Sequence, residues 1–98
     1  MRISDQQLKA IVQEVKVLDP NAAIYLYGSR INDTLKGGDI DIAIVSNQFT
    51  IRNKVQLQIS LMDILEGLRL DVLVVEDETM PFWQLIKPMA IYLNTYAE

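Results

Sequence analysis

The chain has 98 residues, half of them hydrophobic and 22% charged, a balance that predicts one small globular domain over residues 1–98 and not a disordered segment. Nine Lys and Arg stand against thirteen Asp and Glu, so the net charge is −4, which argues against unaided binding to nucleic acid. The sequence contains no cysteine and no histidine. This excludes disulfides, thiolate metal sites, thiol nucleophiles and histidine bases, so any chemistry falls mainly to carboxylates.

Nothing in the sequence predicts a membrane protein or a secreted one. No segment reaches the roughly 18 continuous apolar residues of a membrane span. The first residues, MRISDQQLKAIVQEV, carry charges where a signal peptide needs an apolar stretch. We therefore expect a cytoplasmic protein that has no contact with a membrane.

The first half of the sequence predicts a helix and two strands. Ser4 caps a helix that runs to Leu18, and Gln7 stands in the capping-box position. A strand rich in β-formers follows at 23–27, and a polar loop separates it from a second strand at 39–45. Alternation in the second strand directs three isoleucines into the core, Ile40, Ile42 and Ile44.

The second half predicts a long helix at 51–68 and a strand at 70–75 that is apolar enough to be central in its sheet. A short helix at 81–87 and a last strand at 89–93, expected at a sheet edge, complete the chain. The helical crossover makes the second and third strands parallel. The fold class is therefore α/β (α+β), a small mixed β-sheet of about four strands with helices packed on it.

The long helix carries two apolar stripes that lie more than about 150° apart around its axis. Val55, Ile59 and Met62 form the first stripe. The second stripe has four members, Leu57, Leu61, Ile64 and Leu68. Either the sheet and a neighbouring helix cover one stripe each, or the second stripe docks against another chain.

Three carboxylates and a Gly-Ser pair are predicted to meet at one edge of the sheet. Asp39 and Asp41 open the second strand and share a face because they are two residues apart. Asp71 opens the third strand, which is parallel to the second and begins at the same edge. The pair Gly28-Ser29 ends the first strand, and it reaches this edge if that strand is antiparallel to the second.

Carboxylates on adjacent strands repel one another unless a cation joins them, and such oxygen ligands suit Mg²⁺ or Mn²⁺. Two such ions would clamp the attacking and leaving oxygens of a phosphoryl displacement. Gly28 lets the backbone approach a ligand closely, and the Ser29 hydroxyl with nearby amides can hold phosphate oxygens. Each motif alone is weak, because Asp-x-Asp and Gly-Ser are common in solvated loops. An Asp inside the apolar strand LDVLVV is harder to explain without a function.

Other polar and aromatic residues have ordinary structural explanations. Lys36 is expected to be a solvated loop charge, whereas Arg30 either packs locally or contacts a triphosphate. The cluster Pro81-Phe82-Trp83 fits a core or interface better than a platform for a nucleotide base. Four tyrosines are expected to be sheet and edge residues and not modification sites, Tyr25, Tyr27, Tyr92 and Tyr96.

The segment GSRINDTLKGGDIDIAIV, followed by LDVLVV, resembles the minimal nucleotidyltransferases of the DNA polymerase beta-like superfamily. The resemblance covers nearly the whole chain, and the combined motif is specific. It implies that Asp39, Asp41 and Asp71 are catalytic and bind Mg²⁺ or Mn²⁺, and that Gly28, Ser29 and Arg30 bind the nucleotide, with ATP as substrate. The nine residues between Ser29 and Asp39 are one fewer than in the commonest form of the family.

The same resemblance implies a partner. Minimal nucleotidyltransferases are often encoded beside a small helical HEPN protein as toxin–antitoxin pairs, in which they transfer AMP from ATP to a tyrosine of the toxin. This predicts an adenylyltransferase antitoxin that forms a hetero-oligomer with a HEPN-type protein. Two alternatives remain: a nucleotide-binding or partner-binding module that neutralises by occlusion, and an enzyme that acts on a small molecule or an RNA end.

Overall fold

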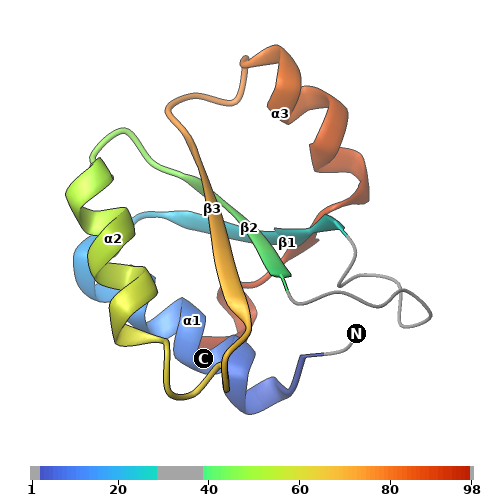
Figure 1. Cartoon of the computed structure of the whole chain (residues 1–98). Helices are drawn as coiled ribbons and strands as arrows, with labels where there is room; N and C mark the ends of the chain where they lie inside the picture. Colours follow the sequence, from blue (N-terminus) through green and yellow to red (C-terminus); the bar gives the residue numbers. More distant parts are fainter. Residues whose placement is uncertain (1–2, 29–38, 98) are drawn as a thin grey trace.

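The computed structural model describes residues 3–28 and 39–97 (Figure 1). The elements are α1 (Asp5–Leu18), β1 (Ala23–Tyr27), β2 (Asp39–Val45), α2 (Ile51–Ser60), β3 (Arg69–Val75), α3 (Pro81–Ile86), η2 (Lys87–Met89), β4 (Ile91–Tyr92) and η3 (Asn94–Ala97). These agree closely with the predicted ranges, except in the second half of the long helix. Within the described ranges, no helix has the length and apolar character that crossing a membrane requires.

The four strands form one mixed sheet in the order β3-β2-β1-β4. Strand β1 is antiparallel to both β2 and β4, and β2 is parallel to β3. The predicted fold class and strand directions are therefore confirmed. The prediction that the third strand is central is wrong, because β4 extends the sheet beside β1 and leaves β3 at the opposite edge.

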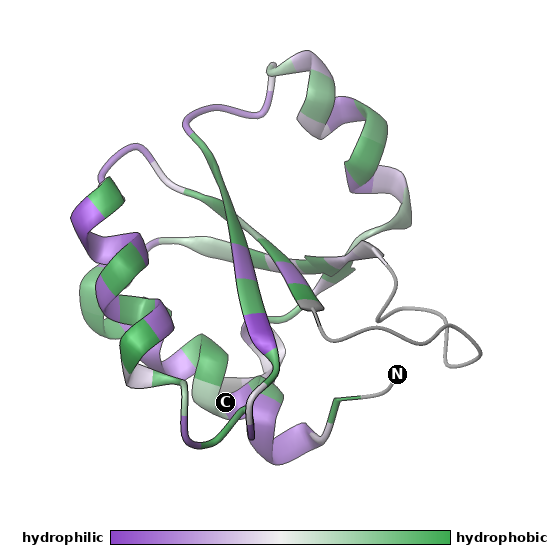
Figure 2. Ribbon diagram, in the orientation of Figure 1, coloured by the Kyte–Doolittle hydropathy of each residue, from purple (hydrophilic) through white to green (hydrophobic). Residues whose placement is uncertain are grey.

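The sheet buries a different apolar cluster on each face. Helices α1 and α2 cover one face, and α3 covers part of the other (Figures 1 and 2). Even-numbered residues of the strands pack against α1 and α2, among them Ile24, Leu26, Ile40, Ile42, Ile44, Leu70 and Val72. Odd-numbered residues face the other way, where Ala43 and Val75 pack with Trp83 of α3. This alternation places the odd-numbered acidic residues on the face of α3.

Helix α1 begins as the sequence predicts. The Ser4 hydroxyl accepts a bond from the backbone N–H of Gln7, and the Gln7 side chain accepts one from the backbone N–H of Ser4. The Gln7 amide also donates to the carbonyl of Ile64 at 3.0 Å. The first turn of α1 thereby holds the segment that follows α2.

The predicted helix at 51–68 is too long, since regular helix ends at Ser60 and a series of turns follows. The Ser60 hydroxyl donates to the carbonyl of Gln56 at this point, a bond that competes with regular helix. The chain then reverses through Glu66 and Gly67, both of which have positive φ. The second apolar stripe packs in the core, with Leu57 and Leu61 each 1% exposed, so the alternative in which it docks against another chain is wrong. The alternative in which the sheet and a neighbouring helix cover one stripe each is wrong as well, because the first stripe is exposed.

Candidate functional site

Two carboxylates meet where β2 and β3 begin, on the face that α3 leaves open at this end. Asp41 lies directly beside Asp71 in the parallel register, and Tyr27 of β1 lies directly beside Asp41 on its other side. Side chains at paired positions project from the same face of a sheet, so the three form a row across β1, β2 and β3. The predicted meeting of Asp41, Asp71 and the end of β1 is therefore observed.

Gly28 lies directly against the side chain of Asp41 in this row. Its φ is 82°, in the left-handed region that favours glycine. A Cβ atom at this position would lie 3.2 Å from Cγ of Asp41 and closer still to a carboxylate oxygen. Glycine at 28 therefore serves two needs: it permits the turn that ends β1, and it leaves room for the carboxylate of Asp41.

A guanidinium group stands beside the second carboxylate. Nε of Arg69 lies 3.4 Å from Oδ1 of Asp71, and both side chains are substantially exposed. Arg69 also pairs in register with Asp39, whose backbone is described and whose side chain is not. Like charges directly opposite one another destabilise a sheet, and the cation of Arg69 offsets part of that repulsion around Asp71.

The pKa of the Tyr27 phenol depends on burial and on the negative charge of the site. Burial raises the pKa of Tyr27, and the carboxylates of Asp41 and Asp71 raise it further. The phenol therefore remains protonated at neutral pH. A neutral O–H beside two carboxylates can donate a hydrogen bond to an anionic ligand.

The donor chemistry of Asp41 and Asp71 fits a hard divalent cation. Carboxylate oxygens are the ligands that Mg²⁺ and Mn²⁺ prefer, and these two groups start neighbouring strands on one face. Among the described side chains, no cluster of three or more such ligands occurs. Asp39 is the predicted third ligand, and its side chain lies outside the described part.

The remaining predicted residues divide into two groups. Ser29, Arg30 and Lys36 lie outside the described residues. Trp83 is fully buried and makes an edge-on contact with Tyr25, with ring centroids 4.9 Å apart, whereas Phe82 is exposed. A core role for Trp83 agrees with the prediction, and the cluster that it forms with Ala43 and Val75 extends as far as Tyr27 at one side of the site.

The sequence reasoning missed Arg69 and gave Tyr27 no part in the site. Period-two alternation was sufficient to place Arg69, which is two residues before Asp71 and therefore shares its face. Tyr27 joins the site through its antiparallel pairing with Asp41, a register that alternation alone does not give.

Comparison with known families gives one match. A family model described as a nucleotidyltransferase domain matches residues 8–91, which include both carboxylates, Gly28 and every strand up to the start of β4. No curated protein sequence matches the chain.

Proposed function

The chain belongs to the nucleotidyltransferase domain family, and from that premise we propose that it is a Mg²⁺-dependent adenylyltransferase that transfers AMP from ATP to a hydroxyl of a partner protein. The observation that carries the proposal is the pairing of Asp41 with Asp71 beside Gly28. Like charges at paired positions destabilise a sheet, so the presence of both carboxylates indicates that they serve a function.

The proposed reaction needs one bond made and one bond broken at phosphorus. The acceptor oxygen bonds to the α-phosphorus of ATP, the bond from that phosphorus to the bridging oxygen breaks, and pyrophosphate leaves with the electron pair. A divalent cation held by the carboxylates supplies positive charge to the phosphate oxygens and favours the ionised acceptor.

The residues of the chain have distinct parts in this proposal. Asp39, Asp41 and Asp71 hold the metal ions, and Asp71 also takes the proton of the acceptor hydroxyl. Gly28, Ser29 and Arg30 hold the phosphates of the nucleotide. Tyr27 donates its phenolic proton as a hydrogen bond to a phosphate oxygen and does not ionise, because its pKa is raised.

The acceptor that we propose is a tyrosine of a helical HEPN-type protein encoded alongside, with the present chain as the antitoxin of the pair. The resemblance described above supports this assignment. The net charge of −4 supports it as well, because an acidic chain suits a protein hydroxyl better than an RNA backbone.

Intact-mass spectrometry of the neighbouring protein, after incubation with this chain, ATP and Mg²⁺, tests the proposal. We expect the mass of one AMP group to be added. The addition should disappear with Asp41→Asn and persist with Asp77→Asn, a matched substitution in the exposed turn after β3. Equal modification by the wild type and Asp41→Asn would refute catalysis at this site.

The alternative is neutralisation by occlusion, without turnover. It predicts that Asp39→Asn combined with Asp41→Asn leaves neutralisation of the partner unchanged. Catalytic neutralisation predicts that the double variant still binds the partner and no longer protects against it. A stable complex that shows no added mass would favour occlusion.

A further inference from the structure

The two edges of the sheet differ in how they are protected. Strand β4 has two residues, and beyond it the Asn94 side chain accepts a bond from Ile24 and donates one to Ala22. Strand β3 has seven residues and a neighbouring strand on one side only. Its second half, Val72 to Val75, has no charged residue and no proline, although these are the usual devices that blunt an edge.

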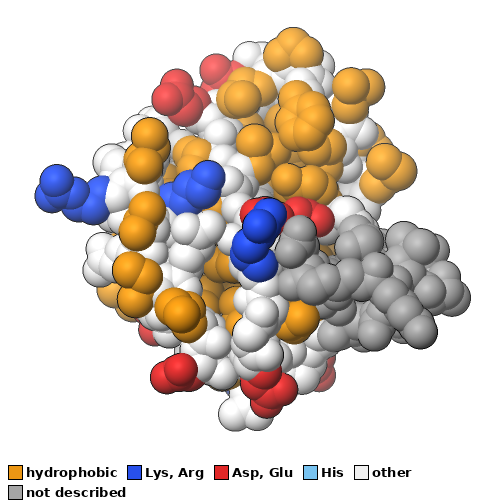
Figure 3. Space-filling model, in the orientation of Figure 1, with side chains coloured by type: hydrophobic (Ala, Val, Ile, Leu, Met, Phe, Trp, Pro, Cys, Tyr) orange, Lys and Arg blue, Asp and Glu red, His pale blue; other side chains and the backbone are white. Residues whose placement is uncertain are grey.

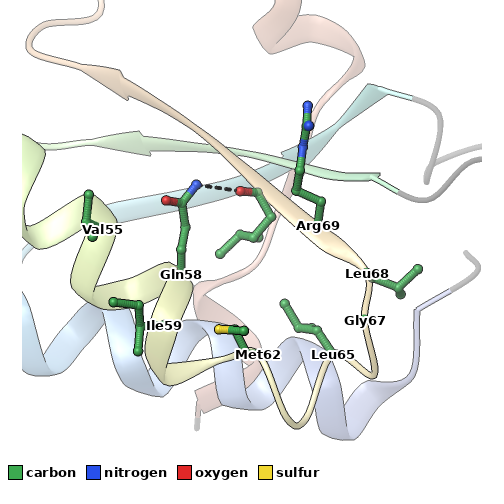
Figure 4. A pocket seen from close by; sticks show the side chains of 9 residues that line it. Val55, Gln58, Ile59, Met62, Leu65, Gly67, Leu68 and Arg69 are labelled. Carbon is green, nitrogen blue, oxygen red and sulfur yellow. Dashed lines mark hydrogen bonds between the residues drawn. The ribbon is translucent and has the colours of Figure 1, made fainter.

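An exposed apolar surface lies beside this edge. Ile51, Val55, Ile59 and Met62 lie along one side of α2 and its end, with Ile51 82% exposed and Ile59 and Met62 each 64% exposed. We call these four residues the α2 stripe. Figure 3 shows it as a column of hydrophobic side chains. Between this stripe and β3 lies a groove of about 510 Å³ (Figure 4), lined mainly by Val55, Ile59, Met62, Leu68, Arg69 and Leu70.

The backbone of β3 alternates between the sheet and the groove. The carbonyl of Val75 accepts from the backbone N–H of Ser46, at the end of β2. The carbonyl of Leu70 instead accepts from the Gln58 side chain of α2, at 2.7 Å (Figure 4). Since backbone groups point alternately to the two sides of a strand, Val72 and Val74 direct their N–H and C=O groups outward.

The charges along this edge are self-complementary. Arg69 begins β3, and the acidic turn Glu76-Asp77-Glu78 follows it. Along the chain the α2 side has the same order, with Arg52 and Lys54 first and Asp63 and Glu66 after them, but α2 runs antiparallel to β3, so each of the two layers has its own basic end and acidic end. If a second copy lies antiparallel across the seam, each basic end faces an acidic end. A parallel arrangement would set like charges together.

We propose that a second copy of this chain occupies the groove, with the two β3 strands antiparallel and the two α2 stripes packed against each other. The two-fold axis pairs residues of the same parity, so the faces of both sheets continue across the seam. In the register centred on Leu73, Val72 and Val74 exchange backbone bonds and Arg69 faces Asp77. The result is an eight-stranded sheet with the carboxylates of both copies on one face.

Sedimentation equilibrium of the full chain from about 1 μM to about 1 mM gives the oligomeric state. We expect a monomer–dimer equilibrium with a dissociation constant in the micromolar range. Added salt should raise this constant, because it screens the charge pairs across the seam. A chain that remains monomeric across this range would overturn the proposal. The measurement is independent of the proposed transferase activity, because it requires neither ATP nor a partner.

Cross-linking locates the interface, because the chain contains no cysteine. In the proposed register, Leu73 lies opposite its own copy in a non-hydrogen-bonded pair, with a separation that suits a disulfide. We expect Leu73→Cys to form a disulfide-linked dimer on mild oxidation. The matched control is Leu85→Cys on the exposed side of α3, which should stay monomeric. Equal cross-linking of the two variants, or none in either, would overturn the assignment.

A charge reversal tests the seam without altering any apolar contact. Arg52→Glu sets acidic groups against Asp63 and should raise the dissociation constant about tenfold. Adding Asp63→Lys reverses both ends and should restore the wild-type value. Thermal melting followed by circular dichroism shows that each variant is folded. A double variant that dimerises no better than Arg52→Glu alone would contradict the proposed orientation.

Discussion

The carboxylates at the two ends of strand β2 have contrasting surroundings. At its C-terminal end, Asp19 is 4% exposed, accepts bonds from the Ser46 hydroxyl and the Asn21 backbone N–H, and links the end of α1 to the sheet. At the other end, Asp41 and Asp71 lie side by side on an open face. A buried carboxylate with its bonds satisfied has a structural role, whereas two half-buried carboxylates at paired positions on one face are suited to binding a cation.

The largest effect separates the two ends by activity. Asp41→Asn should lower the rate of nucleotidyl transfer by about 10³-fold, or about 4 kcal/mol, because it removes a charged metal ligand. Its melting temperature should change far less than that of an Asp19 variant. The rate of pyrophosphate release, measured beside thermal melting, provides both values. An active Asp41→Asn protein would remove the distinction between the ends.

The reverse pattern is expected at the structural end. Asp19→Ala should lower the free energy of unfolding by about 2–3 kcal/mol, because the Ser46 hydroxyl and the Asn21 N–H lose a buried charged acceptor. Activity per folded molecule should remain. Urea unfolding followed by tryptophan fluorescence is a suitable measurement because Trp83 is fully buried. A loss below about 0.5 kcal/mol would show that this carboxylate has no structural role.

Two glycines separate backbone strain from crowding of the site. Gly28 and Gly67 have nearly equal φ, 82° and 85°, and only at Gly28 would a Cβ meet other atoms within 4 Å. Gly67→Ala should cost about 1 kcal/mol of stability and leave metal affinity unchanged. Gly28→Ala should cost more and also weaken Mn²⁺ binding, because it displaces Asp41. Isothermal titration with Mn²⁺ compares them, and equal affinities would contradict the close approach of Gly28 to Asp41.

A smaller effect concerns the cation at the open end. Arg69→Gln should destabilise the metal-free protein by about 0.5 kcal/mol at low salt, because the exposed pair with Asp71 is lost. Added Mg²⁺ should offset that loss. Thermal melts at micromolar protein with and without Mg²⁺ measure it, with Lys54→Gln as a control of equal charge. A loss that Mg²⁺ does not reduce would place the role of Arg69 elsewhere.

The smallest effect is in the alkaline range. The pKa of Tyr27 is raised above 10.0 in the folded chain, so the unfolded chain loses this proton first. The contribution to stability is full below pH 10 and declines as pH rises through the folded pKa. Ring carbon NMR of Asp41→Asn should show the Tyr27 titration at lower pH. Tyr25 serves as the control. Burial is the main cause that raises its pKa and Asp41 does not contribute, so its titration should stay at the same pH.

Much of this architecture could be read from local patterns. The capping box at Ser4 and Gln7, the alternation in β2 and the parallel crossover to β3 follow from neighbouring residues, and they placed Asp41 beside Asp71. The position of β3 at an edge could not be read in this way, because it depends on which strand β4 joins.

The end of α2 was also beyond the sequence pattern. Leu57 and Leu61 are both buried and keep helical spacing, although regular helix gives way to turns after Ser60. The spacing therefore does not reveal where the helix ends. Both alternatives for the two stripes left the first stripe covered, whereas Val55, Ile59 and Met62 are exposed and the second stripe is buried. Tertiary contacts, such as the bond from Gln7 to Ile64, decide which stripe faces the sheet.

Manganese binding followed by electron paramagnetic resonance tests the central claim most directly, because it requires neither the acceptor nor turnover. With a non-hydrolysable ATP analogue present, the account predicts that the wild-type chain binds Mn²⁺ and that Asp41→Asn and Asp71→Asn each lose most of this affinity. Asp77→Asn, in the exposed turn after β3, should bind as the wild type does. Undiminished binding by both Asp41→Asn and Asp71→Asn would contradict a metal site at this edge of the sheet.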